Sequence, residues 1–451
     1  MPHVLVGGEA RRETPMRCEQ ARRAAALTRR SLLEIGGLSA LGLSGAQPLT
    51  GAPRGGGDDH ACIVLWLTGG PSQLDSFDPK PDAPQEIRGT LSAIETNVSG
   101  IRVCETFPRL SRHADKYALL RSVHHGLDDH ARGMCWLLAG RLHDTIKYPT
   151  MGSVVSRLKR PLSDLPQFVT LPRLNPIAGI PMVEHSQTAG DLGPGWDPLV
   201  PDGQPGQPGF GVRDISLPEG VAVARFERRE ALLRHLTPAG SGEPGPPRQR
   251  EAVYQRAFEL LGSDRVRTAF DLDAESAATR ERYGRHAFGQ GALLARRLVE
   301  RGVRFVTVNW PSYYAWDGHS NTINGMKKLS PIADTATAAL FEDLHQRGML
   351  ERTLVMVMGE FGRTPRFNKE AGRDHWIHVF SVLMGGGGVR GGQVIGSSTV
   401  DGYPDERPIH AREVVASAYH SLGVDLLSEM QTVGGRPFQA LPGASPISEL
   451  F

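Results

Sequence analysis

Cysteine and excess charge of either sign are scarce in this sequence. Its 451 residues include only four cysteines, Cys18, Cys62, Cys104 and Cys135, and their spacing matches neither a zinc knuckle nor a disulfide framework. The 51 basic and 49 acidic residues leave a formal net charge of +2, so overall charge gives no reason to expect nucleic acid or an acidic membrane as a partner. Any anion binding is therefore expected to be local.

Long apolar runs are also missing. A helix needs about 20 predominantly apolar residues to cross a bilayer, and we expect no permanent transmembrane helix. With 39% hydrophobic and 22% charged residues, the chain has the composition of a globular protein with one large core or two moderate ones.

The beginning of the chain has the pattern of an export signal. A twin-arginine pair at residues 29–30 precedes weakly apolar residues 35–43 and a small-residue cleavage pattern at residues 44–46. We expect residues 1–46 to be a twin-arginine (Tat) signal and residues 47–60 to be a linker. This signal predicts transport by the twin-arginine export machinery to the periplasm, the cell envelope or the medium. An uncleaved anchor, a later translation start and a chance arginine pair are the alternatives.

Strand and helix patterns alternate along the rest of the chain. Nearly continuous apolar runs predict strands, and apolar residues at helical spacing predict helices. Strand, helix, strand in this order builds an α/β layered domain with a mostly parallel sheet. Glycine- and proline-rich residues 175–247 are interpreted as an insertion in a single domain, residues 61–451. The predicted strands are residues 61–68, 117–123, 303–309 and 353–358, and the predicted helices are 289–301 and 332–347.

Potential metal ligands follow several of the predicted strands. The carboxyl ends of parallel strands meet at one edge of a sheet, so side chains in the following loops can converge on one ion. Carboxylate oxygens and imidazole nitrogens are ligands that zinc, manganese and magnesium accept. A divalent metal is therefore the expected cofactor, zinc or manganese first, with calcium or magnesium as further candidates. The expected ligands are Asp75 and Asp78 after the first strand, Asp317 and His319 in WDGHSN, and Glu360, Asp374 and His375 in MGEFGRTPRFNKEAGRDHW.

Arginines accompany these ligands. Arg363, Arg366 and Arg373 lie between Glu360 and Asp374 in the sequence. A guanidinium can hold a phosphate or sulfate through two parallel hydrogen bonds, so these arginines are candidate anion-binding residues. Pairing of the same arginines with nearby carboxylates is the structural alternative.

Five segments resemble a known family. The resemblance runs from about residue 61 to the C-terminus. The segments are GGPSQLDSFDPKPDAPQEIRG, SVHHGLDDHARGMCWLLAG, WDGHSN, ERTLVMVMGEFGRTP and GRDHWIHVFSVLMGGGGVRGG. In these segments the chain resembles the exported bacterial family called domain of unknown function 1501, which is grouped with the alkaline phosphatase and sulfatase superfamily. The resemblance implies an alkaline-phosphatase-like layered fold with helices on both faces of a mostly parallel sheet.

The resemblance also draws attention to His130. Sulfatases place a modified Cys or Ser nucleophile at the start of a helix that ends in Leu-Thr-Gly-Arg, and the matching position in HARGMCWLLAGR is His130. His130 is either a nucleophile oriented by Asp129, or a ligand that helps to hold a metal-activated water. The second role is preferred because acids and histidines outnumber candidate nucleophiles. Two alternatives stay open: His130 caps the helix without taking part in chemistry, or His124 or His125 takes the role proposed for it.

The expected function is that of an exported, metal-dependent hydrolase of phosphate or sulfate esters, in which metal-activated water attacks the ester. The resemblance implies a phosphorylated or sulfated small molecule or polysaccharide as substrate. The alternative is a non-catalytic relative that binds anionic polymers at the cell envelope.

Overall fold

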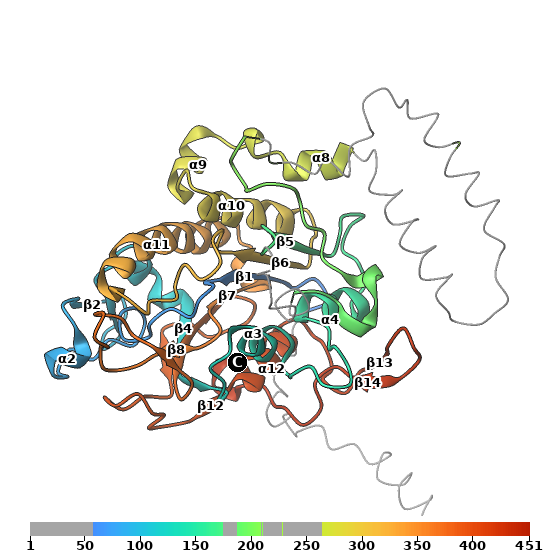
Figure 1. Ribbon diagram of the computed structural model, residues 1–451. Coiled ribbons are helices and arrows are strands. Elements are labelled where there is room, and N and C mark those ends of the chain that lie inside the picture. The colour runs from blue at the N-terminus through green and yellow to red at the C-terminus, as the bar shows by residue number, and fades with distance from the viewer. Residues whose placement is uncertain (1–56, 175–186, 209, 211–227, 229–263) are drawn as a thin grey trace, which may run out of the picture. The chain divides into compact units, whose positions relative to one another are not determined.

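Figure 1 shows the computed structural model of the chain, which describes residues 57–174, 187–208, 210, 228 and 264–451. The expected signal, most of the expected linker and the larger part of the expected insertion at 175–247 lie outside the described residues. Among the helices in the described ranges, none is both long and apolar enough to cross a membrane.

An eight-stranded sheet forms the centre of the fold. Its order is β11-β4-β10-β7-β1-β6-β5, and β12 also pairs with β4. β10 runs antiparallel to both of its neighbours, and the other strand pairings in this sheet are parallel. The strands are β1 (Ala61–Trp66), β4 (Tyr117–His124), β5 (Phe168–Leu171), β6 (Phe305–Asn309), β7 (Thr353–Met358), β10 (Phe380–Gly385), β11 (Gln393–Ile395) and β12 (Ile409–His410).

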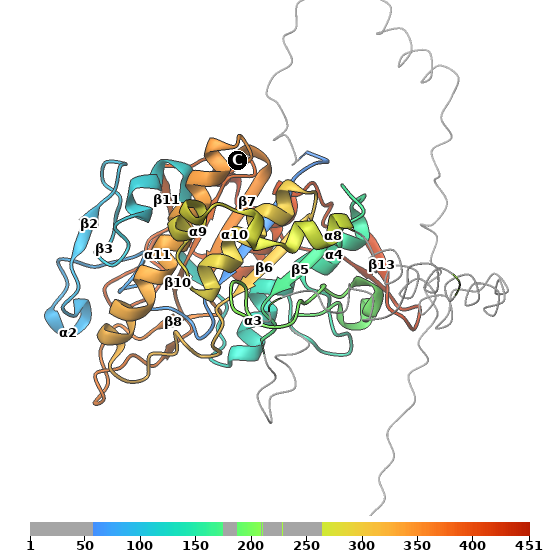
Figure 2. The same cartoon turned by 90° about the horizontal axis from the view of Figure 1, so that it is seen from above.

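Helices cover both faces of the sheet, as Figure 1 shows. One face carries α9 (Ala277–Tyr283), α10 (Ala287–Glu300) and α11 (Thr322–Gln346), and the view from above in Figure 2 shows α10 and α11 lying over the strands. The other face carries α3 (His130–Ala139), α4 (Met151–Leu158) and α12 (Ala411–Ser421). Shorter elements at the periphery are α2 (Gln85–Arg88), α8 (Asp264–Phe270) and the strand pairs β2 (Ala93–Glu95) with β3 (Arg102–Cys104), β8 (Gly362–Arg363) with β9 (His375–Trp376), and β13 (Glu429–Gln431) with β14 (Pro437–Gln439).

Strand β1 shows why the fold has two cores. All of its residues are buried, and successive side chains of a strand point to opposite faces of the sheet. Ile63 and Leu65 pack into the core below α10 and α11, whereas Cys62, Val64 and Trp66 pack into the core with α3, α4 and α12. A strand that is covered on both faces needs an apolar residue at every position, which explains the continuous apolar run.

The predicted fold class, α/β with a mostly parallel sheet and helices on both faces, is confirmed. The four predicted strands correspond to β1, β4, β6 and β7. The predicted helix at 332–347 is too short, because α11 begins at Thr322 and continues through Pro331. In the added first part, Ile323, Met326 and Leu329 recur at helical spacing and pack against the core, a pattern that the prediction did not include.

Candidate metal centre

One edge of the sheet gathers the loops that carry most of the expected site residues. β1, β6 and β7 are parallel, and β4 runs in the same direction as β7 because β10 between them is antiparallel to both. The carboxyl ends of these strands therefore lie at the same edge as the amino end of β10. The segments that follow β4, β6 and β7 and the segment that precedes β10 meet there.

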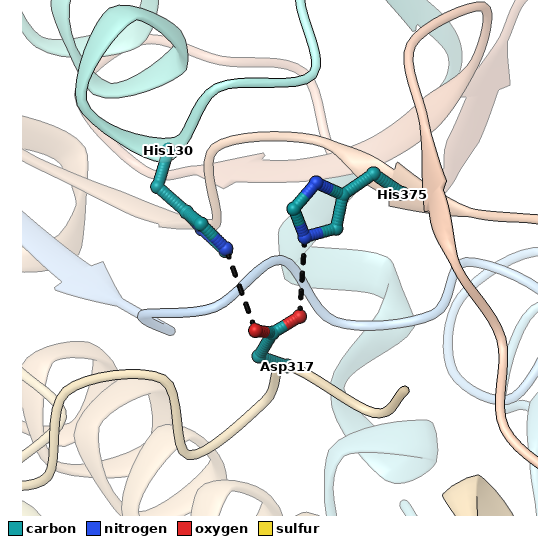
Figure 3. Close-up of side chains that lie close together, drawn as sticks. All are labelled: His130, Asp317 and His375. Atoms are coloured by element: carbon teal, nitrogen blue, oxygen red, sulfur yellow. Dashed lines mark hydrogen bonds and ion pairs between the residues drawn. The ribbon is translucent and has the colours of Figure 1, made fainter. Parts of the chain in front are cut away.

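Three side chains from these segments converge and are called here the His-Asp cluster: His130, Asp317 and His375 (Figure 3). His130 is the first residue of α3, Asp317 lies in the loop after β6, and His375 belongs to β9, just before β10. One ligand atom from each lies within 4.8 Å of the others. Nε2 of His130 is 3.5 Å from Oδ2 of Asp317, and Nε2 of His375 is 3.2 Å from Oδ1.

His319 adds a fourth nitrogen to this arrangement. Its Nε2 lies 3.1 Å from Oδ1 of Asp317 and 3.1 Å from Nε2 of His375. The side chain of His319 is 47% exposed, compared with 22% for His375 and 17% for Asp317. The centre therefore has a buried side at His130 and an open side at His319.

The ring of His130 is oriented from behind by Glu360. Nδ1 of His130 donates to Oε1 of Glu360 at 2.6 Å, and the same oxygen accepts the backbone N–H of Gly69 at 2.8 Å. Glu360 follows β7 and is 1% exposed. With Nδ1 donating to Glu360, the protonated ring of His130 directs its Nε2–H at Asp317, and loss of that proton would free the Nε2 lone pair for a metal ion.

His319 and His375 are oriented in the same way. Nδ1 of His319 donates to Oδ1 of Asp374 at 2.9 Å, and Nδ1 of His375 donates to the backbone carbonyl of Asp128 at 2.7 Å. A carbonyl oxygen can only accept, so the proton of neutral His375 is on Nδ1. The two Nε2 atoms face each other at 3.1 Å; a proton on one of them would make this contact a hydrogen bond, and a shared cation would take the place of that proton.

The spacing of these atoms fits a metal ion. Zinc binds imidazole nitrogen and carboxylate oxygen at about 2.0–2.2 Å with tetrahedral geometry, which places neighbouring ligand atoms about 3.3–3.5 Å apart. The distances between Asp317 oxygens and the histidine nitrogens are 3.1, 3.2 and 3.5 Å. His130, Asp317, His319 and His375 are therefore the residues that would hold a divalent cation.

The charges of the cluster also affect its protonation. Burial lowers the pKa of His130, but hydrogen bonds and charge interactions with Asp317 and Glu360 outweigh burial and raise that pKa to about 9. Burial of Asp317 is likewise outweighed by His130, His375 and the Arg363 guanidinium, which hold the pKa of this carboxyl well below its usual range. Asp317 is thus an anion that accepts hydrogen bonds from His130, His375 and Arg363.

Two aromatic rings hold the histidines from the side. The Phe361 ring lies 4.7 Å from the His130 ring and 4.3 Å from the His375 ring, measured between centroids. The Tyr314 ring lies 4.5 Å from the His130 ring. Phe361 is fully buried, so these contacts restrict rotation of the imidazoles.

Glycines allow the loops of the centre to approach one another. Gly69 has a φ of +110°, and a Cβ at this position would lie 2.5 Å from the backbone nitrogen of Asp317. A Cβ at Gly372 would lie 1.9 Å from the carbonyl oxygen of His319. The loops after β1 and before β9 therefore pack directly on the segment that carries Asp317 and His319.

Asp75 and Asp78 do not join the cluster. Asp75 accepts from Nε of Arg373 at 2.8 Å, and both side chains are fully buried. Asp78 pairs with Nζ of Lys80 at 3.0 Å and accepts from the hydroxyl of Ser398. Their carboxylates follow β1 as expected, but they are engaged by these cations and this hydroxyl. Glu360 and Asp374, also expected as ligands, contact histidine Nδ1 atoms instead.

The candidate anion-binding arginines have different surroundings. Arg363 is fully buried and donates to Asp317 and to the backbone carbonyls of Gly69 and Gly70. Arg373 is also fully buried, and it binds Asp75 together with backbone carbonyls. Arg366 is 64% exposed and lies 3.3 Å from Glu86. The guanidinium groups of Arg363 and Arg373 thus already donate to protein oxygens. Anion binding remains a prediction for Arg366.

The expected partner of His130 is replaced by another residue. Asp129 does not orient the imidazole but caps α3, where its side chain accepts from the backbone N–H of Arg132. His125 contributes its Nε2 to a hydrogen bond with the carbonyl of Glu360, and the His124 ring lies against His410. Neither of these two histidines belongs to the His-Asp cluster in the described part of the chain.

Sequence reasoning missed three contributors to the centre. The carbonyl of Asp128 and the rings of Tyr314 and Phe361 have no recognisable ligand chemistry, although each is adjacent or close in sequence to an expected residue. The available signal was proximity in the sequence: Asp128 precedes Asp129, Phe361 follows Glu360, and Tyr314 lies in the segment just before Asp317. Side-chain type alone gives no indication that a backbone carbonyl orients a histidine.

The fold and the cluster define an α/β protein with a histidine-rich centre suited to a divalent cation. The chain belongs to the family described as protein of unknown function (DUF1501), whose model matches residues 59–451. This match confirms the resemblance carried by the five sequence segments. A search of curated proteins finds no similar sequence.

The chain is distantly similar to several solved structures. A sulfatase from Pseudoalteromonas sp. is 13% identical with a TM-score of 0.37, over 81% of this chain and 68% of that chain. A protein in the alkaline phosphatase superfamily from Vibrio parahaemolyticus is 10% identical with a TM-score of 0.37, over 84% and 70% of the two chains. A phosphonate monoester hydrolase from Silicibacter pomeroyi is 10% identical with a TM-score of 0.33, over 86% and 78%. At these scores the likeness carries no argument about activity.

Proposed function

We propose that this protein is an exported, metal-dependent hydrolase of phosphate or sulfate esters. The observation that carries the proposal is the convergence of three histidine Nε2 atoms on the Asp317 carboxylate, with every Nδ1 held by an oxygen acceptor. The oxygen acceptors behind the rings leave each Nε2 directed at the Asp317 carboxylate, as in a metal site whose ligands are oriented by their second ring nitrogen.

The donor set favours zinc first, with manganese as the second candidate. Imidazole nitrogens suit zinc, whereas manganese, calcium and magnesium prefer oxygen ligands, which Asp317 alone supplies among these four residues. When bound, such a cation polarises an ester oxygen and lowers the pKa of a coordinated water. Asp317 supplies negative charge to the site, and Glu360, Asp374 and the Asp128 carbonyl keep the three rings oriented. His319 is the most exposed of the four side chains, so a substrate would reach the centre from its side.

Direct attack by water is supported by the hydrogen-bond partners of the four candidate ligands. In the described part of the chain, no serine, threonine or cysteine side chain hydrogen-bonds to the side chains of the four candidate ligands. His130 occupies the position expected for the nucleophile, but its Nε2 faces Asp317 and its Nδ1 faces Glu360. We therefore propose that His130 acts as a ligand, the role that was preferred from the sequence.

The same observation supports one alternative. A relative that lost its nucleophile at the position of His130 can keep the metal centre and bind a phosphorylated or sulfated polymer at the cell envelope without cleaving it. The twin-arginine pattern at residues 29–30 supports action outside the cytoplasm for both functions. A phosphorylated or sulfated small molecule or polysaccharide is the proposed partner in either case.

The test combines metal analysis with turnover. Metal content is measured by mass spectrometry on the purified chain, on Asp317→Ala and on the control Asp401→Ala, in which an exposed aspartate is removed. We expect zinc or manganese in the parent and in the control, and little or none in Asp317→Ala. Loss of a ligand is expected to weaken metal affinity more than ~100-fold, because a ligand contributes more than the groups that orient it. A parent without bound metal would rule out the proposal.

Turnover separates the two functions. Aryl phosphate, phosphodiester and aryl sulfate substrates are assayed with added zinc, manganese, magnesium or calcium. Hydrolysis that is lost in Asp317→Ala and kept in Asp401→Ala supports the hydrolase. A metal-loaded protein that binds a sulfated polysaccharide and cleaves none of these esters supports the non-catalytic alternative.

A further inference from the structure

Tyr314 lies in a backbone conformation that side chains rarely adopt. Its φ is +59°, in the left-handed region. Most described residues with positive φ are glycines, and the other exceptions besides Tyr314 are Asn321, Ala371 and Arg407. A residue with a Cβ is strained in this region and glycine is not, so the turn at Tyr314 holds a large side chain where glycine would be less strained.

The ring and the backbone carbonyl of Tyr314 both contact residues of the metal centre. The ring of Tyr314 lies 4.5 Å from the ring of His130, with an angle of 57° between the planes. The backbone carbonyl of Tyr314 accepts the N–H of Asp317 at 3.0 Å. The Tyr313 ring, 4.2 Å away, holds the Tyr314 ring from a further direction. One residue therefore links the imidazole at the start of α3 to the carboxylate in the loop after β6.

We propose that Tyr314 is a positioning residue, which uses a strained turn to press its ring against His130 while its carbonyl fixes the backbone of Asp317. This inference rests on the proposed function, in which His130 and Asp317 are metal ligands. Strain of this kind persists only where surrounding contacts enforce it, and it is concentrated at functional sites. The ring limits rotation of the imidazole, so that Nε2 stays aimed at Asp317 when Nδ1 is bonded to Glu360.

Three substitutions separate the ring from the strain. Tyr314→Phe keeps the ring, Tyr314→Ala removes the ring and keeps the strained Cβ, and Tyr314→Gly removes both. Zinc affinity is measured by competition with a chromophoric chelator, and stability by the urea midpoint. We expect Tyr314→Phe to stay within about threefold of the parent, and Tyr314→Ala and Tyr314→Gly to bind zinc ~10-fold or more weakly. Tyr314→Gly has the higher urea midpoint of these two variants.

The decisive comparison is between the alanine and glycine variants. If Tyr314 only stabilised the fold, zinc affinity would recover in Tyr314→Gly along with stability. We expect no such recovery, because the ring is missing in both variants. Affinities of both variants within twofold of the parent, or an affinity that follows the urea midpoint, would overturn the proposal. Arg407→Gly, at another residue with positive φ whose side chain pairs with Glu413 and Glu449, is the control and leaves zinc affinity unchanged.

A second measurement keeps this inference separate from the proposed function. Histidine-selective ¹⁵N labelling reports the ring of His130 in the metal-free protein, with the signal assigned through His130→Gln. Tyr314→Gly shifts or broadens this signal and Tyr314→Phe does not. If the parent binds no metal, the proposed function fails, and the positioning role is then decided by this spectrum: an unchanged His130 signal in Tyr314→Gly overturns it.

Discussion

Glu360 and His130 form a buried hydrogen bond, in which Nδ1 of the imidazole lies 2.6 Å from Oε1 of the carboxylate. The backbone N–H of Gly69 donates to the same oxygen at 2.8 Å, whereas Oε2 is buried without a partner in the described part of the chain. The carboxylate is therefore fixed from the β1 loop, and it fixes the ring in turn. This relationship makes Glu360 the buried anchor of the centre.

Glu360→Gln tests this anchor. The neutral amide is a weaker acceptor than a carboxylate and does not raise the basicity of the imidazole. We expect metal affinity to fall by roughly 10- to 100-fold, measured by chelator competition. Glu370→Gln makes the same chemical change at an exposed position of the neighbouring loop and leaves the affinity unchanged. Equal affinities in the two variants would show that Glu360 does not orient a ligand.

Asp75→Ala tests the buried ion pair with Arg373. Both side chains are fully buried, and removal of Asp75 leaves the guanidinium without its counter-charge. We expect the free energy of unfolding, measured in urea, to be about 3–5 kcal/mol lower than in the parent. The matched variant Glu86→Ala breaks an exposed ion pair with Arg366, which lies in the same loop between β8 and β9 as Arg373. We expect this variant to change the free energy of unfolding by about 1 kcal/mol or less. Similar losses in both variants would contradict the role assigned to burial.

The fold was largely predictable from the sequence, and the centre was predictable in part. Continuous apolar runs identified β1, β4, β6 and β7, and strand order along an α/β sheet brought Asp317, His319 and His375 to one edge. These inferences succeed because apolar runs depend on local sequence, and because helical crossovers keep successive strands parallel, so that their carboxyl ends share one edge.

The roles of individual acids were not predictable. Asp75 and Glu360 both follow a buried strand, yet one pairs with Arg373 and the other accepts from His130. The difference depends on which cation the fold brings within reach, and these partners are 298 and 230 residues away in the chain. The position of His375 likewise depends on distant parts of the chain. Strand β10 pairs antiparallel with β4 and β7, so the segment before β10, which carries His375, lies at the edge where those strands end.

Gly372→Ala tests the close approach of two loops. A Cβ at residue 372 would lie 1.9 Å from the carbonyl oxygen of His319, so the backbone has to move. We expect a loss of about 1–3 kcal/mol in unfolding free energy and weaker metal binding, because His319 is displaced. Gly325→Ala is the control: a Cβ there meets nothing within 4 Å, and alanine in helix α11 stabilises by about 0.5–1 kcal/mol. Unchanged metal affinity in Gly372→Ala would contradict the contact.

Asp334 makes stability depend on pH far from the metal centre. It is 2% exposed within α11, and its carboxylate accepts the backbone N–H groups of Arg109 and Leu110 at 3.0 and 2.7 Å. Burial raises the pKa of Asp334 to about 6, although these N–H groups act in the opposite direction. The native state therefore holds the proton more tightly than the unfolded chain does. The stability from this group is complete below about pH 4 and is lost as the pH rises through about 6.

Asp334→Asn removes this titration. Urea unfolding of the parent and the variant is compared at pH values between 4 and 7.5, and the quantity of interest is the difference between their unfolding free energies. We expect the parent to lose on the order of 2–3 kcal/mol relative to the variant across this interval, since each unit of pKa difference corresponds to about 1.4 kcal/mol. Taking the difference cancels the titration of the other groups, including the histidines of the centre. A difference that stays constant with pH would mean that Asp334 keeps an ordinary pKa in the folded protein.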